Sequence, residues 1–228
     1  MFKKIEYDEV EVSEIIDDTK FESYFDGKIM DFIGYKFLRI FLTAITAGIA
    51  KPWADVIFYK YMFSHTIYDG KRLAFRGSGE ELFVERFKWI FFSIITLGIY
   101  LFWIPVKKQK WIVSNLYFEE DDYSRGESFF FGTVLKMLGV NLLTIFLSVI
   151  SFGLLVPFSI CYKRRWLMKY IIISRKKIVF EGKSINLFGK CLLWALLTIV
   201  TLGIYGIWVP VKLYDWKAKN TFLKMKLV

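Results

Sequence analysis

A short motif that recurs four times sets the organisation of this chain. Two nearly identical runs, Thr96–Tyr100 and Thr201–Tyr205, read Thr-Leu-Gly-Ile-Tyr and lie 105 residues apart. Weaker copies at Thr46–Ile49 and Ser151–Leu154 are also 105 residues apart. A Phe-x-Gly run precedes every copy, with its glycine 21 residues before the motif glycine. Repetition at a constant offset indicates a chain built from four related units.

The prolines show that the four units are of two kinds. All four prolines of the chain follow a motif glycine, by four residues in the first and third units and by seven in the second and fourth. This alternation indicates duplication of a two-unit block and predicts two repeats, over 23–125 and 126–228. The acidic residues before them predict a flexible tail over 1–22. We interpret the motif as the place where a helix ends or bends. Its residues are Gly48, Pro52, Gly98, Pro105, Gly153, Pro157, Gly203 and Pro210.

Charge-free runs accompany each motif. Hydrophobic residues make up 55% of the sequence, and charged residues are absent from 40–50, 89–106, 137–162 and 191–211. A helix of about 20 apolar residues crosses a bilayer core of about 30 Å. These runs predict a mainly α integral membrane protein with four transmembrane helices, arranged as two tandem two-helix repeats. Short β-hairpins and amphipathic basic segments are expected between the helices.

A second topology fits the same pattern. Each unit would dip into the membrane and return, with the Gly-Ile or Gly-Leu step at its tip and the segment after the proline as the returning limb. We prefer four crossings, because dipping units would carry Lys163, Arg164 and Arg165 to bilayer depth. Each charge there costs about 2.5–3.5 kcal/mol.

Three β-hairpins are predicted outside the apolar runs. In the first, residues 65–68 and 72–75 flank Asp69-Gly70, a dipeptide that favours a two-residue turn. In the second, residues 170–173 and 178–180 flank Ser174 to Lys177. In the third, residues 114–118 and 128–131 flank an acidic loop.

The formal net charge of +10 bears on the partner. Beside apolar runs, positive charge favours anionic membrane lipids over nucleic acid. Three basic clusters are candidates for contact with lipid headgroups or a protein partner, although simple flanking charge gives the same pattern. They are Lys107, Lys108 and Lys110; Lys163, Arg164 and Arg165; and Arg175, Lys176 and Lys177.

Residues typical of catalysis are missing. The sequence has one histidine, His65, and no Walker, His-Glu-x-x-His or Gly-x-Ser-x-Gly motif, so we predict no enzyme activity, no metal site and no cofactor. The two cysteines do not form a disulfide scaffold. We expect a non-enzymatic membrane module that binds anionic lipid or a protein partner and self-associates as a homo-oligomer.

A polar seam supports an alternative function, a small channel or transporter. Its members follow helical spacing in the third apolar run, and they are Asn141, Thr144, Ser148 and Ser151. Hydroxyl groups also commonly bond the backbone of their own helix or a neighbouring helix, which would make the seam structural.

Several of these runs resemble one protein family. The Phe-x-Gly run, the Thr-Leu-Gly-Ile-Tyr run with its tryptophan and proline, the hairpin Tyr68–Phe75 and the tail Asp215–Phe222 are similar to those of YjgN-type bacterial proteins. The resemblance covers about Phe21 to Leu223. It implies a multi-pass protein of the bacterial inner membrane and supplies no activity, because the function of the family is unknown.

Overall fold

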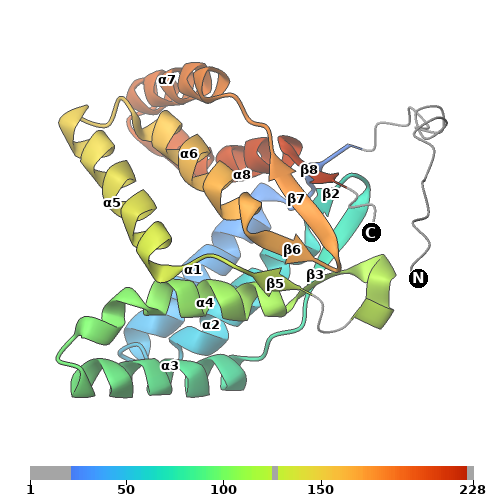
Figure 1. The fold of residues 1–228 in the computed structure, drawn as a ribbon. Coiled ribbons are helices and arrows are strands. Elements are labelled where there is room, and N and C mark those ends of the chain that lie inside the picture. The colour runs from blue at the N-terminus through green and yellow to red at the C-terminus, as the bar shows by residue number, and fades with distance from the viewer. Residues whose placement is uncertain (1–21, 125–127, 225–228) are drawn as a thin grey trace, which may run out of the picture.

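The same order of elements occurs twice along the chain (Figure 1). The structure, a computed structural model, describes residues 22–124, here the first half, and 128–224, here the second half. The first half contains β1 (Tyr24–Phe25), α1 (Ile29–Ile45), α2 (Lys51–Ser64), β2 (Thr66–Tyr68), β3 (Lys71–Phe75), α3 (Gly79–Ile95), the 3-10 helix η1 (Ile99–Phe102), α4 (Ile104–Ser114), β4 (Leu116–Phe118) and η2 (Glu119–Ser124). The second half contains β5 (Phe129–Phe130), α5 (Val134–Ile150), α6 (Val156–Lys169), β6 (Ile171–Ile173), β7 (Lys176–Phe180), α7 (Ser184–Val200), η3 (Ile204–Ile207), α8 (Val209–Lys219) and β8 (Thr221–Lys224).

Each half has one four-stranded antiparallel sheet, in the order β1-β2-β3-β4 or β5-β6-β7-β8. The two central turns have two residues with positive φ, Asp69 and Gly70 in one sheet and Ser174 and Arg175 in the other. The first two predicted hairpins are therefore confirmed. The third is wrong: β4 pairs with β3 and β5 pairs with β6, because the two strands complete different sheets.

Four helical hairpins leave the sheets, and each reverses at a motif glycine. The glycines have φ of +88 to +94°, a left-handed conformation that ends an α-helix. Each glycine amide donates to the carbonyl five residues back, as Gly98 does to Ser93 at 2.7 Å. A proline then opens the returning helix, where its missing N–H costs nothing.

The prediction of four transmembrane helices is wrong. Each apolar run folds back on itself: residues 137–162 are divided between α5 and α6, and residues 191–211 between α7 and the η3–α8 segment. Within residues 22–124 and 128–224, no helix has both the length and the apolar character needed to cross a bilayer. The predictions of a transmembrane, multi-pass protein of the inner membrane depended on such helices, and the structure contradicts them. The chain reverses direction at the Gly-Ile and Gly-Leu steps, the positions at which the second topology turns back.

The two halves join through their sheets and through α4 and α8. Asp69, in the turn of one sheet, accepts a hydrogen bond from the Leu223 amide of the other sheet at 2.6 Å. At the corresponding place, Ser174 Oγ accepts from the Phe118 amide at 3.3 Å. The buried core is continuous across the junction. Of the predicted acidic tail, residues 1–21 lie outside the described residues.

Candidate functional site

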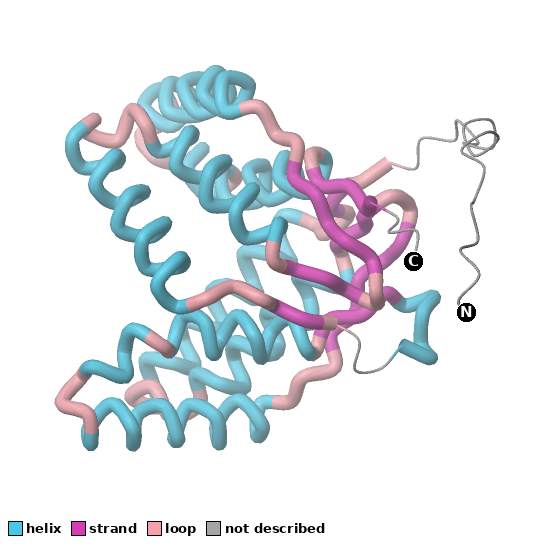
Figure 2. The backbone as a smooth tube through the Cα atoms, viewed as in Figure 1, coloured by secondary structure: helices cyan, strands magenta, loops and turns pink. Residues whose placement is uncertain are grey.

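The four hairpin turns lie at one end of the molecule, on the left of Figures 1 and 2, and both sheets lie at the other. We call each turn, from three residues before its motif glycine to one residue after it, a tip. The residue directly before the glycine has φ of +47 to +51° in every tip. It is Ala47, Leu97, Phe152 or Leu202, and the three larger side chains are 94%, 98% and 93% exposed.

The flanking tip residues are also aliphatic and exposed. Three residues before and one residue after each glycine stands an Ile, Leu or Val whose exposed fraction is 60–71%. These are Ile45, Ile49, Ile95, Ile99, Ile150, Leu154, Val200 and Ile204. Each tip therefore presents apolar side chains that residues 22–124 and 128–224 leave uncovered.

A hydroxyl in every tip bonds the backbone on both sides of the turn. Thr96 Oγ1 donates to the Phe92 carbonyl at 2.7 Å and accepts from the Tyr100 amide at 3.0 Å. Thr201 makes the same pair of bonds with Leu197 and Tyr205. Thr46 and Ser151 do so in the first and third tips. Backbone groups released where the helix ends are thereby bonded within the segment.

Charged residues begin at a nearly constant distance from each tip. The first charged residue after the glycine is Lys107, Lys163 or Lys212 in the last three hairpins, nine or ten residues on, and all three are exposed. At 1.5 Å per helical residue this is about 14 Å, close to half of a bilayer core of about 30 Å. Lys51, three residues after Gly48, departs from the pattern.

The predicted basic clusters do not form one patch. Lys107, Lys110, Lys163 and Arg165 are exposed on the returning helices α4 and α6. The other cluster on the chain, Arg175 to Lys177, lies at the turn between β6 and β7, at the sheet end of the molecule.

Four members of these clusters contact other groups of the protein. Arg165 donates to the Gly182 carbonyl at 3.1 Å, and Lys176 pairs with Asp121. Lys108 Nζ lies 5.8 Å from the ring centroid of Tyr59. Arg164 donates to Tyr68 Oη at 3.0 Å.

The predicted polar seam is bonded internally. Thr144 Oγ1 donates to the Asn141 carbonyl at 2.9 Å, Ser148 Oγ donates to the Thr144 carbonyl at 2.7 Å, and Ser151 serves the tip. The Asn141 side-chain oxygen is buried and accepts no hydrogen bond. The hydroxyl donors of the seam are therefore used within α5, the arrangement expected for a structural role.

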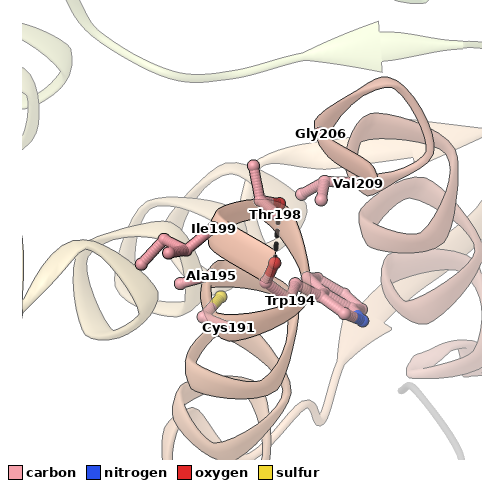
Figure 3. Close-up of a pocket in the computed structure, with 7 residues that line it drawn as sticks. All are labelled: Cys191, Trp194, Ala195, Thr198, Ile199, Gly206 and Val209. Carbon is pink, nitrogen blue, oxygen red and sulfur yellow. Dashed lines mark hydrogen bonds between the residues drawn. The ribbon is translucent and has the colours of Figure 1, made fainter. Parts of the chain in front are cut away.

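Apolar grooves separate the two limbs of the second-half hairpins. One, of about 470 Å³, lies between α7 and the η3–α8 limb, and Figure 3 shows Thr198 beside it with its hydroxyl bonded to the Trp194 carbonyl. Its other lining residues are Cys191, Ala195, Ile199, Gly206 and Val209. A second groove, of about 290 Å³, lies between α5 and α6 and is lined by Thr144, Ile145, Ser148, Val149, Val156, Ser159, Ile160 and Lys163.

A buried ionic group in the first half was missed by the sequence reasoning. Asp55 of α2 is fully buried and lies 2.6 Å from Arg39 Nε of α1. Its other oxygen pairs with Arg86 of α3. The signal that could have found it is the repeat, since the positions 105 residues on are Thr144, Ile160 and Cys191. A carboxylate and two arginines at positions that are uncharged in the second copy point to mutual pairing.

The described residues contain no group of three or more His, Cys, Asp or Glu side chains that could hold a metal. His65 Nδ1 instead lies 2.8 Å from the Tyr61 carbonyl, within the end of α2. The exposed side chains of the tips and of the returning helices are therefore suited to contact apolar and anionic groups.

Comparison with known proteins places part of the chain. No curated protein and no solved structure matches it. Residues 20–92, from just before β1 into α3, match the model of a family described as "Bacterial protein of unknown function (DUF898)". YjgN-like proteins belong to that family, so the resemblance noted from the sequence motifs is confirmed over this stretch.

Proposed function

We propose that this protein is a non-enzymatic lipid-binding module that inserts its four tips into one leaflet of an anionic bilayer from one side. The sheets and the base of the hairpins stay outside the hydrocarbon, and no helix crosses it. In this arrangement Lys107 and Lys163 of the returning helices lie at headgroup depth, whereas the Lys212 ammonium bonds Tyr205 Oη. Each cation near an anionic surface contributes about 1 kcal/mol.

The observation that carries the proposal is the residue before each tip glycine. A left-handed φ at a residue other than glycine costs roughly 1–2 kcal/mol, and turns in water use Gly, Asn or Asp there. Three of the four tips instead hold Leu97, Phe152 and Leu202, at 93–98% exposure. Leu or Phe at such a position is unfavourable in water and favourable in hydrocarbon. Burial of one such side chain contributes about 1.5–3 kcal/mol.

The tip hydroxyls support the same environment. In hydrocarbon each unbonded backbone group costs several kcal/mol, so irregular backbone is tolerated only where its polar groups are satisfied. Thr46, Thr96, Ser151 and Thr201 each bond one carbonyl and one amide of their own tip. In water, solvent molecules could bond the same carbonyl and amide, so a turn there would not need these side-chain hydrogen bonds.

Vesicle flotation tests the proposal. The full chain, transferred from detergent to vesicles of phosphatidylcholine and phosphatidylglycerol in equal parts, is expected to float with the vesicles. A variant with Leu97→Asp, Phe152→Asp and Leu202→Asp is expected to remain at the bottom of the gradient. A charged residue in hydrocarbon costs about 2.5–3.5 kcal/mol, so each substitution lowers the affinity on the order of 100-fold.

A matched control uses the far end of one hairpin. Leu135, in the first turn of α5, is 82% exposed but belongs to the end of the helix nearer the sheets. Leu135→Asp is expected to float like the wild type. Equal flotation of the triple tip variant would contradict insertion. So would a lipid-free oligomer that the tip substitutions dissociate, because the tips would then bind a second copy of the chain.

A further inference from the structure

A group of cations and tyrosines lies where the two halves meet, away from the tips. Arg164 of α6 joins the halves by donating to Tyr68 Oη of β2. Tyr214 and Lys217 of α8 both lie near enough to Arg164 for its charge to act on them. Tyr59 of α2 also acts on Tyr214, whose pKa burial raises to about 12. The group therefore draws on α2 and β2 of the first half and on α6 and α8 of the second.

Within residues 22–124 and 128–224, no carboxylate pairs with the two cations at its centre. Arg164 Nε is buried and has no hydrogen-bond partner. The pKa of Lys217 is lowered from 10.5 to about 8, first by burial and then by the charge of Arg164, with Lys163 adding to the effect. Buried donors and charges left unpaired cost free energy, and native structures normally satisfy them with an acceptor or an ion.

The nearby carboxylates are committed elsewhere. Asp69, next in the chain to Tyr68, accepts from the Leu223 amide at 2.6 Å. Asp215, two residues before Lys217, accepts from the Phe25 amide at 3.4 Å and lies 2.9 Å from Lys219 Nζ. Both carboxylates hold strands or surface charges in place and are not aimed at the unpaired cations.

We propose that Arg164 and Lys217 form a binding site for a phosphate-type anion at the junction of the halves, with tyrosine hydroxyls as additional donors. A guanidinium presents a planar fork that matches phosphate oxygens, and an ammonium adds a point charge. Tyr68 and Tyr214 bring hydroxyls from opposite halves. Such an anion is either the headgroup of an acidic phospholipid or free phosphate. The site goes beyond tip insertion and does not require it.

Binding at this site is expected to depend on pH through Lys217. In the anion-free protein Lys217 loses its proton near pH 8, whereas an unperturbed lysine holds it to 10.5. An anion stabilises the charged form, so affinity is full below pH 8 and falls as pH rises above it. The groups that act on Lys217 directly are Arg164, Cys161 and Lys163 of α6. Around them, Tyr68 of β2 and Tyr59 of α2 act on Tyr214, and Arg165 of α6 acts on Cys161.

Calorimetric titration with inorganic phosphate tests the site, with the full chain in neutral detergent and chloride used to match ionic strength. The wild type is expected to bind, and Lys217→Met is expected to bind at least about ten-fold more weakly, because a charge-assisted bond is lost. Sulfate, whose charge is constant from pH 7 to pH 10, is the probe for the pH series. Its affinity is expected to fall above pH 8 in the wild type only.

A control separates this effect from loss of net charge. Lys169, exposed in the last turn of α6, carries the same charge as Lys217, and Lys169→Met is expected to bind phosphate like the wild type. Lys217→Met removes a half-buried cation, so its unfolding midpoint in chloride is expected to equal or exceed that of the wild type. The proposal is overturned if Lys217→Met binds as tightly as the wild type does to whichever probe, free phosphate or phosphatidic acid, the wild type binds.

The source of the anion is decided by a second arm with micelles of dihexanoyl phosphatidic acid, compared with dihexanoyl phosphatidylcholine. Saturation by phosphatidic acid with weak binding of free phosphate identifies a lipid headgroup, and the reverse identifies a soluble anion. Both depend on Arg164 and Lys217 and support the site. No response of the wild type to either probe overturns it. Vesicle flotation of tip variants is independent, so failure of one proposal does not decide the other.

Discussion

The two halves of the molecule share their surfaces and differ in their interiors. Both carry the same sheets and the same tip geometry. Inside the hairpins, however, Asp55 of the first half is paired with two arginines, where the second half has Thr144, Ile160 and Cys191. In turn, Arg164 and Lys217 of the second half correspond to Tyr59 and Ile112.

This difference shows which features the duplicated unit kept. The tips, where exposure would leave sequence free to drift, have retained an aliphatic or aromatic residue at a strained position in three copies of four. The interiors have diverged, one toward a carboxylate paired with two arginines and the other toward apolar grooves beside an unpaired arginine nitrogen. Similar tips in both halves fit the proposal that all four tips contact lipid. Different interiors fit the proposal that the cations of the second half, Arg164 and Lys217, bind an anion.

The largest expected effect comes from breaking the buried ionic group of the first half. Asp55→Ala leaves Arg39 and Arg86 partly buried without their carboxylate, and removal of one partner of a buried ion pair costs about 3–5 kcal/mol. We expect the free energy of unfolding to fall by this amount, measured by denaturant titration with tryptophan fluorescence in detergent.

The matched variant replaces the three charged residues of the first half by their equivalents in the second half. Arg39→Thr, Asp55→Ile and Arg86→Cys together reproduce the residues found 105 positions on. Replacing a complete buried ionic group by apolar residues is often neutral or stabilising by about 1–4 kcal/mol. The triple variant is therefore expected to be more stable than Asp55→Ala. If it is less stable, the ionic group contributes more than mutual pairing of its own charges, and the interiors of the halves are not interchangeable.

A smaller effect is expected at the tips, where the halves should behave alike. Thr96→Val and Thr201→Val keep shape but remove the acceptor of the Tyr100 and Tyr205 amides, at a cost of about 1–2 kcal/mol each. Thermal unfolding of both variants in detergent is expected to show equal losses. Thr198→Val is the control, because its hydroxyl only donates to a carbonyl within α7. Unequal losses would mean that the tips of the two halves lie in different environments.

Sequence reasoning found the repeat and the places where helices end, because these depend on local residues. Gly98 and Pro105 alone determine that a helix stops and another starts. The length of the charge-free runs led to the wrong prediction of transmembrane helices. About 20 apolar residues can form either one helix that crosses a bilayer or two shorter helices that fold back on each other. Weighing the glycine and proline more heavily than the run length would have favoured the reversal seen in the structure.

The remaining misses are contacts between residues distant in the sequence. Asp55 meets Arg86, 31 residues on, only because α2 packs between α1 and α3. The cluster from Arg175 to Lys177 looked like the others as a run of charges, but its place in a two-residue turn puts it at the sheet end. Pairing of distant segments depends on the packed fold, which a single sequence read by local pattern does not supply.

The smallest expected effect tests whether the same helix surface is free in both halves. Gly34 of α1 and Gly139 of α5 are repeat-equivalent, exposed and mid-helix, and a Cβ at either position would meet nothing within 4 Å. Alanine in place of an exposed helical glycine stabilises by about 0.5–1 kcal/mol. Gly34→Ala and Gly139→Ala should therefore raise the unfolding midpoint equally in detergent. Destabilisation at Gly139 alone would mean that a second copy covers α5 in solution, so that the halves would differ in assembly as well as in their interiors.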